Sequence, residues 1–245
     1  HAQVIFDPEG EMTALNQPAV EPHILENLEL LGESPHGIDK STVYHITGKI
    51  PRNPNHEDLR QFSPRFDQMP VVQVSEVLGM NEPQETRFTQ AYDLAVRLRK
   101  EVVPALTDYK PDIFGDYMDQ GSPGLKLTNV IDVVNRIIAD PLPPEDKPKF
   151  LSSEFLGQEK KLDQILNATD VHKSKPSWLR VKGMLGTLRR MEIFDMGKSS
   201  PVDYDHMLQP GQVTVFDLSG TNSYGHRNMV ITQVLRGLRN AHEKK

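Results

Sequence analysis

The chain has 245 residues with a net charge of −6, and it is long enough to bury a substantial core. Because it contains no cysteine, disulfide scaffolds, cysteine-based metal centres and thiol nucleophiles are excluded. The acidic balance argues against a protein that coats nucleic acid through bulk positive charge, although a local basic surface stays compatible with it. No apolar run approaches the roughly 20 residues of a membrane span, and no signal peptide is visible, so we expect a cytoplasmic protein without membrane contact.

The first third of the chain predicts strands separated by loops. Residues 4–6 are apolar and end in Asp-Pro and a glycine, which indicates a buried strand that feeds a loop. Residues 24–31 predict a short helix, and the β-branched run at 41–46 predicts a second strand. Residues 48–68 carry three prolines and predict a long loop or an edge strand.

The middle of the chain is helical in character. Residues 70–79 predict a strand in their first half and a helix in their second. Asn81 is the expected N-cap of a helix, and a further helix is expected at 125–139. Two more helices are expected near 150–168 and 177–193.

The last fifth of the chain returns to one strand, at 212–216, and one helix, from about 227. Apolar strands without clean alternation predict a parallel sheet covered on both faces. We therefore predict an α/β fold interrupted by a long helical insertion. The first part of the core is expected at 1–82, the insertion at 83–193 and the later part of the core at 194–245. The start inside a strand, without Met, suggests a piece of a longer protein.

Three carboxylates lie close together after the first strand, at Asp7, Glu9 and Glu11. Ligands of open α/β sheets bind at the carboxyl ends of strands, and such carboxylates suit Mg²⁺ or the polarisation of a water molecule. A solvated acidic turn would have the same sequence. A second apolar run that ends in an acid, at Asp217, is similar to a Walker B strand, but we favour a structural role there.

The sequence contains no Gly-x-x-x-x-Gly-Lys-Ser/Thr loop. Gly183 and Gly186 lie inside a helical pattern, and we interpret them as positions of close helix packing. The window 173–190 is the most basic in the chain. Its Lys182, Arg189 and Arg190 are candidates for contacts with DNA or nucleotide phosphates, although a solvated helix face is the competing interpretation.

The same window holds Trp178, the single tryptophan, which we expect to be a packing anchor. The nine histidines lack the spacing of a zinc site, and no Gly-x-Ser-x-Gly motif indicates a serine hydrolase.

Taken in order, three stretches resemble HerA-like ATPases, a branch of the HerA/FtsK group of hexameric motors. Residues 4–11 are similar to the family's apolar strand followed by Asp-Pro-x-Gly-Glu. Residues 184–195 are similar to a helix that leads into the later half of its core. Residues 208–220 are similar to a later core strand, and the helix that follows also fits.

This resemblance implies part of a RecA-like P-loop NTPase core that binds ATP and Mg²⁺ between the subunits of a homo-hexamer. It implies translocation of double-stranded DNA through a ring pore, a possible nuclease partner, and a role in DNA end processing or phage defence. Asp7 and Glu11 match the family's Asp and Glu and are expected near the γ-phosphate, with Asp7 also near the metal. Gly10 and Glu9 complete the turn beside the nucleotide, Glu9 at a variable position.

The resemblance is incomplete, because the family's P-loop, Walker B strand and arginine finger have no counterpart here. We therefore expect the chain to be the central part of a motor and to be inactive alone. Two alternatives remain open: a non-catalytic oligomerisation or partner-docking α/β domain, and a coupling ATPase of the TraG type.

Overall fold

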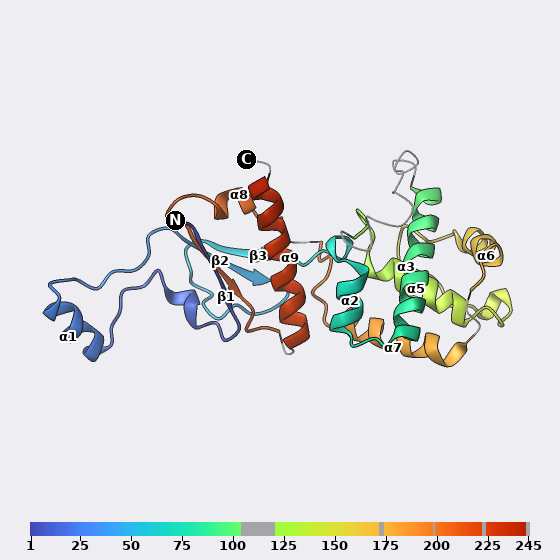
Figure 1. Cartoon of the computed structure of the whole chain (residues 1–245), viewed down its shortest axis with the longest axis horizontal. Coiled ribbons are helices and arrows are strands. Elements are labelled where there is room, and N and C mark those ends of the chain that lie inside the picture. The colour runs from blue at the N-terminus through green and yellow to red at the C-terminus, as the bar shows by residue number, and fades with distance from the viewer. Residues whose placement is uncertain (104–120, 172–173, 198, 222–223, 244–245) are drawn as a thin grey trace. The chain divides into compact units, whose positions relative to one another are not determined.

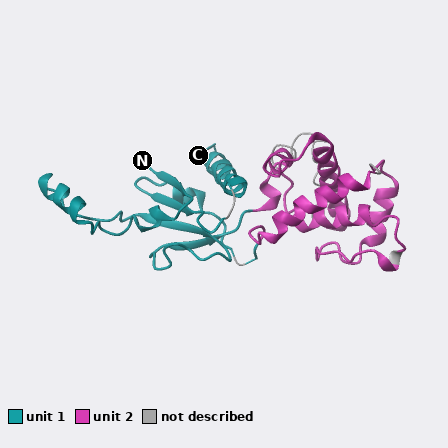
Figure 2. Cartoon of the chain, turned by 90° about the horizontal axis from the view of Figure 1, so that it is seen from below, with its two compact units in different colours: residues 1–64, 196–245 teal, residues 65–195 magenta. Residues whose placement is uncertain are grey.

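The computed structural model describes residues 1–103, 121–171, 174–197, 199–221 and 224–243. The chain forms two compact units (Figure 2). Residues 1–64 and 196–245 form an α/β unit, and residues 65–195 form a helical unit. The helical unit is thus inserted into the sequence of the α/β unit. It contains all of the insertion expected at 83–193 and also takes in the residues from Arg65 onward.

Within the described residues, the α/β unit is built on one parallel sheet of four strands (Figure 1). These are β1 (Gln3–Asp7), β2 (Ser41–Ile46), β3 (Leu59–Phe62) and β4 (Val213–Asp217). Their order is β1-β4-β2-β3, and every pair is parallel. This confirms the predicted α/β class with a mainly parallel sheet. The strands predicted at 4–6, 41–46 and 212–216 are present, and β3 is an edge strand inside the region expected to be a loop or an edge.

The two faces of the sheet bury different side chains, because successive residues of a strand point to opposite sides. One face carries a row of stacked and edge-on aromatic rings, Phe6, Phe216, Tyr44 and Phe62. On the other face Val43, Val213 and Val215 pack with Ile5, Leu15, Ile38 and Leu59. Helix α9 (Tyr224–Glu243) lies beside the sheet and buries Met229, Val230 and Val234.

The helical unit is held together by contacts among α3, α5 and α7. Its described elements are η2 (Phe66–Gln68), α2 (Val71–Val77), α3 (Glu82–Val102), α5 (Leu127–Ile138), η4 (Pro144–Asp146), α6 (Glu159–Asn167) and α7 (Lys175–Arg190). The side chain of Asn81 caps α3 in a capping box with Gln84, as the sequence predicts. Trp178 is 1% exposed, which confirms it as a packing anchor.

Three local predictions are wrong. The segment expected to begin as a strand at residue 70 is helical from Val71, because its buried positions Val71 and Val74 are spaced for a helix face that contacts α3. The helix expected near 150 begins only at Glu159. Gly183 does not mediate close packing, because it is exposed and no atom lies within 4 Å of an added Cβ. Such a Cβ at Gly186 meets only the Arg190 side chain, at 3.5 Å.

A separate arm leaves the α/β unit between β1 and β2 (Figure 1). It carries the helix α1 (Pro22–Leu30), and its base is closed where the Ile38 N–H donates to the Leu15 carbonyl at 2.8 Å. Two short elements complete the unit, η1 (Glu11–Ala14) after β1 and α8 (Tyr204–Met207) before β4. None of the described helices is both long and apolar enough to cross a membrane.

Candidate active site

One register row collects polar side chains at the carboxyl ends of three strands. Asp7 on β1 and His45 on β2 are both register partners of Asp217 on the central strand β4. Since neighbours in register point to the same face, the row places two carboxylates and an imidazole side by side. All three side chains are buried, with 3–4% of their surface exposed. This is the edge at which open α/β sheets bind ligands.

Asp7 organises the turn that follows β1. Its Oδ1 accepts the N–H groups of Glu9 at 3.3 Å and Gly10 at 2.8 Å, and its Oδ2 accepts that of Met12 at 2.6 Å. A carboxylate that accepts three backbone donors is strongly tied to one conformation of the loop. Asp7 therefore acts as the internal scaffold of the acidic turn.

The other predicted residues of the turn lie on this scaffold. Gly10 has a φ of 81°, and an added Cβ would lie 2.6 Å from Cβ and Cγ of Arg52, so the position requires glycine. Glu9 is 75% exposed, and its Oε1 lies 3.6 Å from Nη1 of Arg227 at the start of α9. Glu11 begins η1 and is exposed to solvent. The structure thus brings Asp7, Glu9, Gly10 and Glu11 together and leaves the two glutamates accessible.

Asp217 connects the loop after β2 to the end of β4. Its Oδ1 accepts the backbone N–H of Ser219 at 3.0 Å and the hydroxyl at 2.5 Å, and its Oδ2 accepts the N–H of Arg52 at 2.7 Å. In the same loop, the Asn53 amide donates to the Thr13 carbonyl at 3.0 Å. These contacts agree with the structural role that we favoured for Asp217, and they fix three loops around the acidic turn.

His45 is a site residue that sequence reasoning missed. Desolvation lowers its pKa, although the backbone at Lys49 and Ile46 and the charge of Asp217 act in the opposite direction. Its Nδ1 is buried without a hydrogen-bond partner among the residues that the structure describes. The one available signal was its place, next to last in a predicted strand, which puts it at the carboxyl edge.

The sequence predicts Mg²⁺ at Asp7, and the hydrogen bonds of the Asp7 carboxylate limit how it could bind that ion. Backbone donors take both carboxylate oxygens of Asp7, so little of the carboxylate is left for a metal. The described residues contain no group of three or more His, Asp or Glu side chains arranged to hold a metal ion. Mg²⁺ typically takes only one or two protein carboxylates together with phosphates and water. In this turn the exposed carboxylate of Glu11 would bind Mg²⁺ directly, whereas Asp7 would hold the conformation of the turn.

The predicted phosphate contacts lie on α7, in the helical unit. Lys182, Arg189 and Arg190 are all exposed there, and the Arg190 guanidinium donates to the Thr187 hydroxyl at 3.0 Å. A solvated helix face, the competing interpretation, would show the same exposure.

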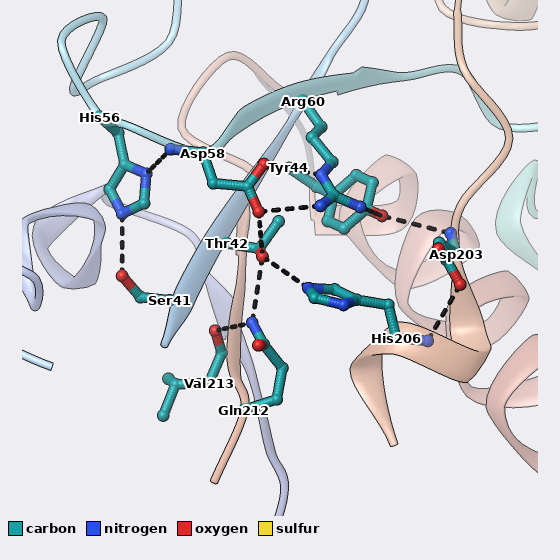
Figure 3. Close-up of polar contacts among 10 residues, drawn as sticks. All are labelled: Ser41, Thr42, Tyr44, His56, Asp58, Arg60, Asp203, His206, Gln212 and Val213. Carbon is teal, nitrogen blue, oxygen red and sulfur yellow. Dashed lines mark hydrogen bonds and ion pairs between the residues drawn. The ribbon is translucent and has the colours of Figure 1, made fainter. Parts of the chain in front are cut away.

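A second polar cluster lies toward the amino ends of β2 and β4 (Figure 3). The Thr42 hydroxyl lies 2.6 Å from Oδ2 of Asp58 and 3.3 Å from Nε2 of His206. The Ser41 hydroxyl lies 3.2 Å from Nε2 of His56. Both arrangements look superficially like a hydroxyl nucleophile with its base.

Hydrogen-bond directions exclude that chemistry. Burial opposes ionisation of Asp58, but hydrogen bonds from Arg60 and Thr42 outweigh it and lower the Asp58 pKa. The ionised carboxylate can only accept, so Thr42 donates to Asp58, and Nε2 of His206 must donate to Thr42. Likewise, Nδ1 of His56 accepts the Asp58 N–H at 3.2 Å, so its Nε2 carries the proton. Neither imidazole accepts a hydroxyl proton, and the cluster is structural.

Comparison with known proteins returns no match to a family model, a curated protein or a solved structure.

Proposed function

We propose that this chain is the central part of an ATP-dependent DNA translocase of the HerA type, with a RecA-like core. The supporting observation is the pairing of β1 with β4. The stretches 4–11 and 208–220, which carry the resemblance, are far apart in sequence but form adjacent parallel strands. Their acidic ends, Asp7 and Asp217, meet at the ligand-binding edge. The pairing places the two stretches that carry the resemblance at one edge of one sheet, which is where the core of such a motor would bind nucleotide.

Hydrolysis of ATP by such a core is attack of water on the γ-phosphorus with ADP as the leaving group. Catalysis depends mainly on positioning and electrostatics, and bound Mg²⁺ supplies neutralisation of the phosphate charge. In this chain Asp7 holds the turn through backbone hydrogen bonds. The exposed Glu11 is then the carboxylate that accepts a hydrogen bond from the attacking water. Glu9 is not assigned this role, because its carboxylate pairs with Arg227 at 3.6 Å.

The remaining parts of the proposal concern DNA and assembly. The exposed Lys182, Arg189 and Arg190 of α7 contact phosphates of a duplex held in the pore of a cytoplasmic homo-hexamer, which works with a nuclease. Phosphate contacts of this kind weaken steeply with salt. Lys182→Glu should therefore reduce DNA affinity and also the slope of affinity against salt.

The decisive experiment measures ATPase activity in the product of the complete reading frame that contains this chain. Glu11→Gln should lower kcat by about 100-fold or more, the usual effect of losing a group that orients or accepts a proton. Nucleotide affinity measured without Mg²⁺ should stay close to that of the wild type. The matched control is Glu9→Gln, an equally conservative change in the same turn, which should leave kcat nearly unchanged. Wild-type kcat in Glu11→Gln would refute the assignment.

A second measurement uses the 245-residue chain alone. It should not hydrolyse ATP, because it lacks the complete phosphate-binding Gly-x-x-x-x-Gly-Lys-Ser/Thr loop. ATPase activity in this chain that Asp7→Ala abolishes would show that the proposed division of the site is wrong.

A second candidate function is a non-catalytic docking domain. The observation that favours it is that the Asp7 and Asp217 carboxylates accept hydrogen bonds from backbone N–H groups. Carboxylates with a purely structural role would show the same bonds. Absence of a Gly-Lys loop upstream of Asp7 in the reading frame would favour this candidate over the motor.

A further inference from the structure

The arm formed by residues 16–37 is anchored at its base and uncovered along its helix. Leu15 and Ile38 bond to each other and pack on the sheet, which fixes where the arm leaves the unit. Beyond them, none of the residues in α1 is buried. Both views show α1 standing away from the sheet (Figures 1 and 2).

One side of α1 is apolar, and the structure covers it only in part, because Ile24 and Leu28 are half-buried. Ile24, Leu25, Leu28 and Leu31 share a stripe at helical spacing. Leu31, at the end of this stripe, remains 75% exposed, and Leu25 36%. A nine-residue helix is too short to be stable in water by itself. A covering partner would supply the missing burial.

The negative charge of the arm favours a positively charged partner. Residues 16–37 contain four acids and no Lys or Arg; the acids are Glu21, Glu26, Glu29 and Glu33. Helix α7 is the converse, with five cations and no acid from Lys175 to Arg190. The chain therefore carries both halves of a complementary pair of helices.

The exposed face of α7 also has the shape of a helix-docking surface. Lys175, Leu179, Gly183, Gly186 and Arg190 share one stripe at spacings of three and four residues. Leu179 is 48% exposed, and the space beside Gly183 is open, so a second helix can approach the backbone closely. Arg180 lies on one side of this stripe, whereas Lys182 and Arg189 lie on the other.

We infer that the arm is a self-association element: α1 of one copy docks on the Leu179–Gly183 stripe of α7 in a second copy. The apolar stripe of α1 covers Leu179 and approaches Lys175, and Glu29, which borders that stripe, faces Arg180. Because the two surfaces differ, the contact is head-to-tail and generates a closed ring or an open filament. The inference rests on the proposed function only for the number of copies in the assembly. The contact between α1 and α7 requires neither ATP nor DNA.

A charge-reversal experiment with the 245-residue chain tests this contact. Sedimentation should show concentration-dependent association of the wild type. Glu29→Lys and Lys175→Glu/Arg180→Glu should each weaken association by at least about tenfold, because like charges then face each other. Mixing the two variants, or combining all three changes, should restore it. The control Glu57→Lys reverses an exposed charge of the same unit outside the arm and should associate like the wild type.

Several outcomes would overturn the inference. These are a wild-type chain that stays monomeric, acidic-arm variants that assemble normally, or cross-links between α1 and α7 that form only within one chain. Lys182→Glu separates this inference from the proposed function, because it should impair DNA binding and leave assembly intact. Loss of DNA binding without loss of assembly in Lys175→Glu/Arg180→Glu would mean that DNA, and not the arm, occupies the stripe.

Discussion

Replacing Asp7 with Ala should destabilise the α/β unit far more than an exposed carboxylate would. The substitution removes an acceptor from three backbone N–H groups, and that of Gly10 is fully buried in its hydrogen bond. Hydrogen bonds to charged groups contribute about 1.5–3 kcal/mol each, but the donors nearer the surface regain water. One buried and two partly buried bonds together give an expected loss of about 3–4 kcal/mol.

Denaturant unfolding followed by far-UV circular dichroism measures this loss, and amide hydrogen exchange localises it. Faster exchange should be confined to peptides that cover β1, β4 and the loops tied to the turn. Trp178 fluorescence reports on the helical unit. Glu9→Ala is the matched control, with an expected change within about 0.5 kcal/mol, since its side chain is largely exposed. A loss below about 1 kcal/mol for Asp7→Ala would refute the scaffold role.

Burial raises the pKa of Asp195 to about 6, so the folded state binds this proton more tightly than the unfolded state, and stability falls as pH rises from about 4 to about 6. Asp195→Asn should flatten this pH dependence and raise stability at pH 8 by roughly 2 kcal/mol, and an unchanged pH profile by thermal unfolding would contradict it. Gly183→Ala should stabilise α7 by about 0.5–1 kcal/mol, because the position is open and alanine favours helix. Gly237→Ala should instead destabilise α9 by about 1–3 kcal/mol, since its Cβ would overlap the Tyr204 ring; equal denaturation midpoints for these two variants would contradict the packing.

The strands were predictable because their residues signal them locally. The β-branched and apolar runs ending at Phe6, Ile46 and Phe216 have few other structures available, and Asp-Pro or glycine follows two of them. The strand order was not readable in the same way. It depends on β4 entering between β1 and β2, a long-range choice that periodicity does not encode.

The same difference between local and long-range signals applies to the residues of the candidate site. Asp7, Glu9, Gly10 and Glu11 lie within five residues of sequence, so a local motif was sufficient to group them. His45 joins Asp7 only through the register of two other strands, and a lone histidine in a strand carries no signal of that neighbour. The backbone hydrogen bonds that occupy Asp7 were equally invisible, because they depend on loop conformation.

The helical predictions failed where tertiary context decided the outcome. Valines at 71, 72, 74 and 77 have strand propensity, but packing on α3 selects the helical spacing. Gly183 and Gly186 were interpreted as contact positions within the fold, but Gly183 is exposed and Gly186 is only half-buried. The open space beside Gly183 is one of the observations on which the proposed self-association surface of α7 is based.

The central strand of the sheet is also the last to be synthesised. β1 has no partner other than β4 among the described strands, and the whole helical unit lies between them in the chain. During synthesis on the ribosome, β1 and β2 therefore cannot pair with β4 until the helical unit has emerged and folded. Until then, the strand edges that will pair with β4 lack hydrogen-bond partners. The contact order of this sheet is high, and its completion should limit the folding rate. A nascent chain stalled before Val213 would expose two strand edges prone to aggregation.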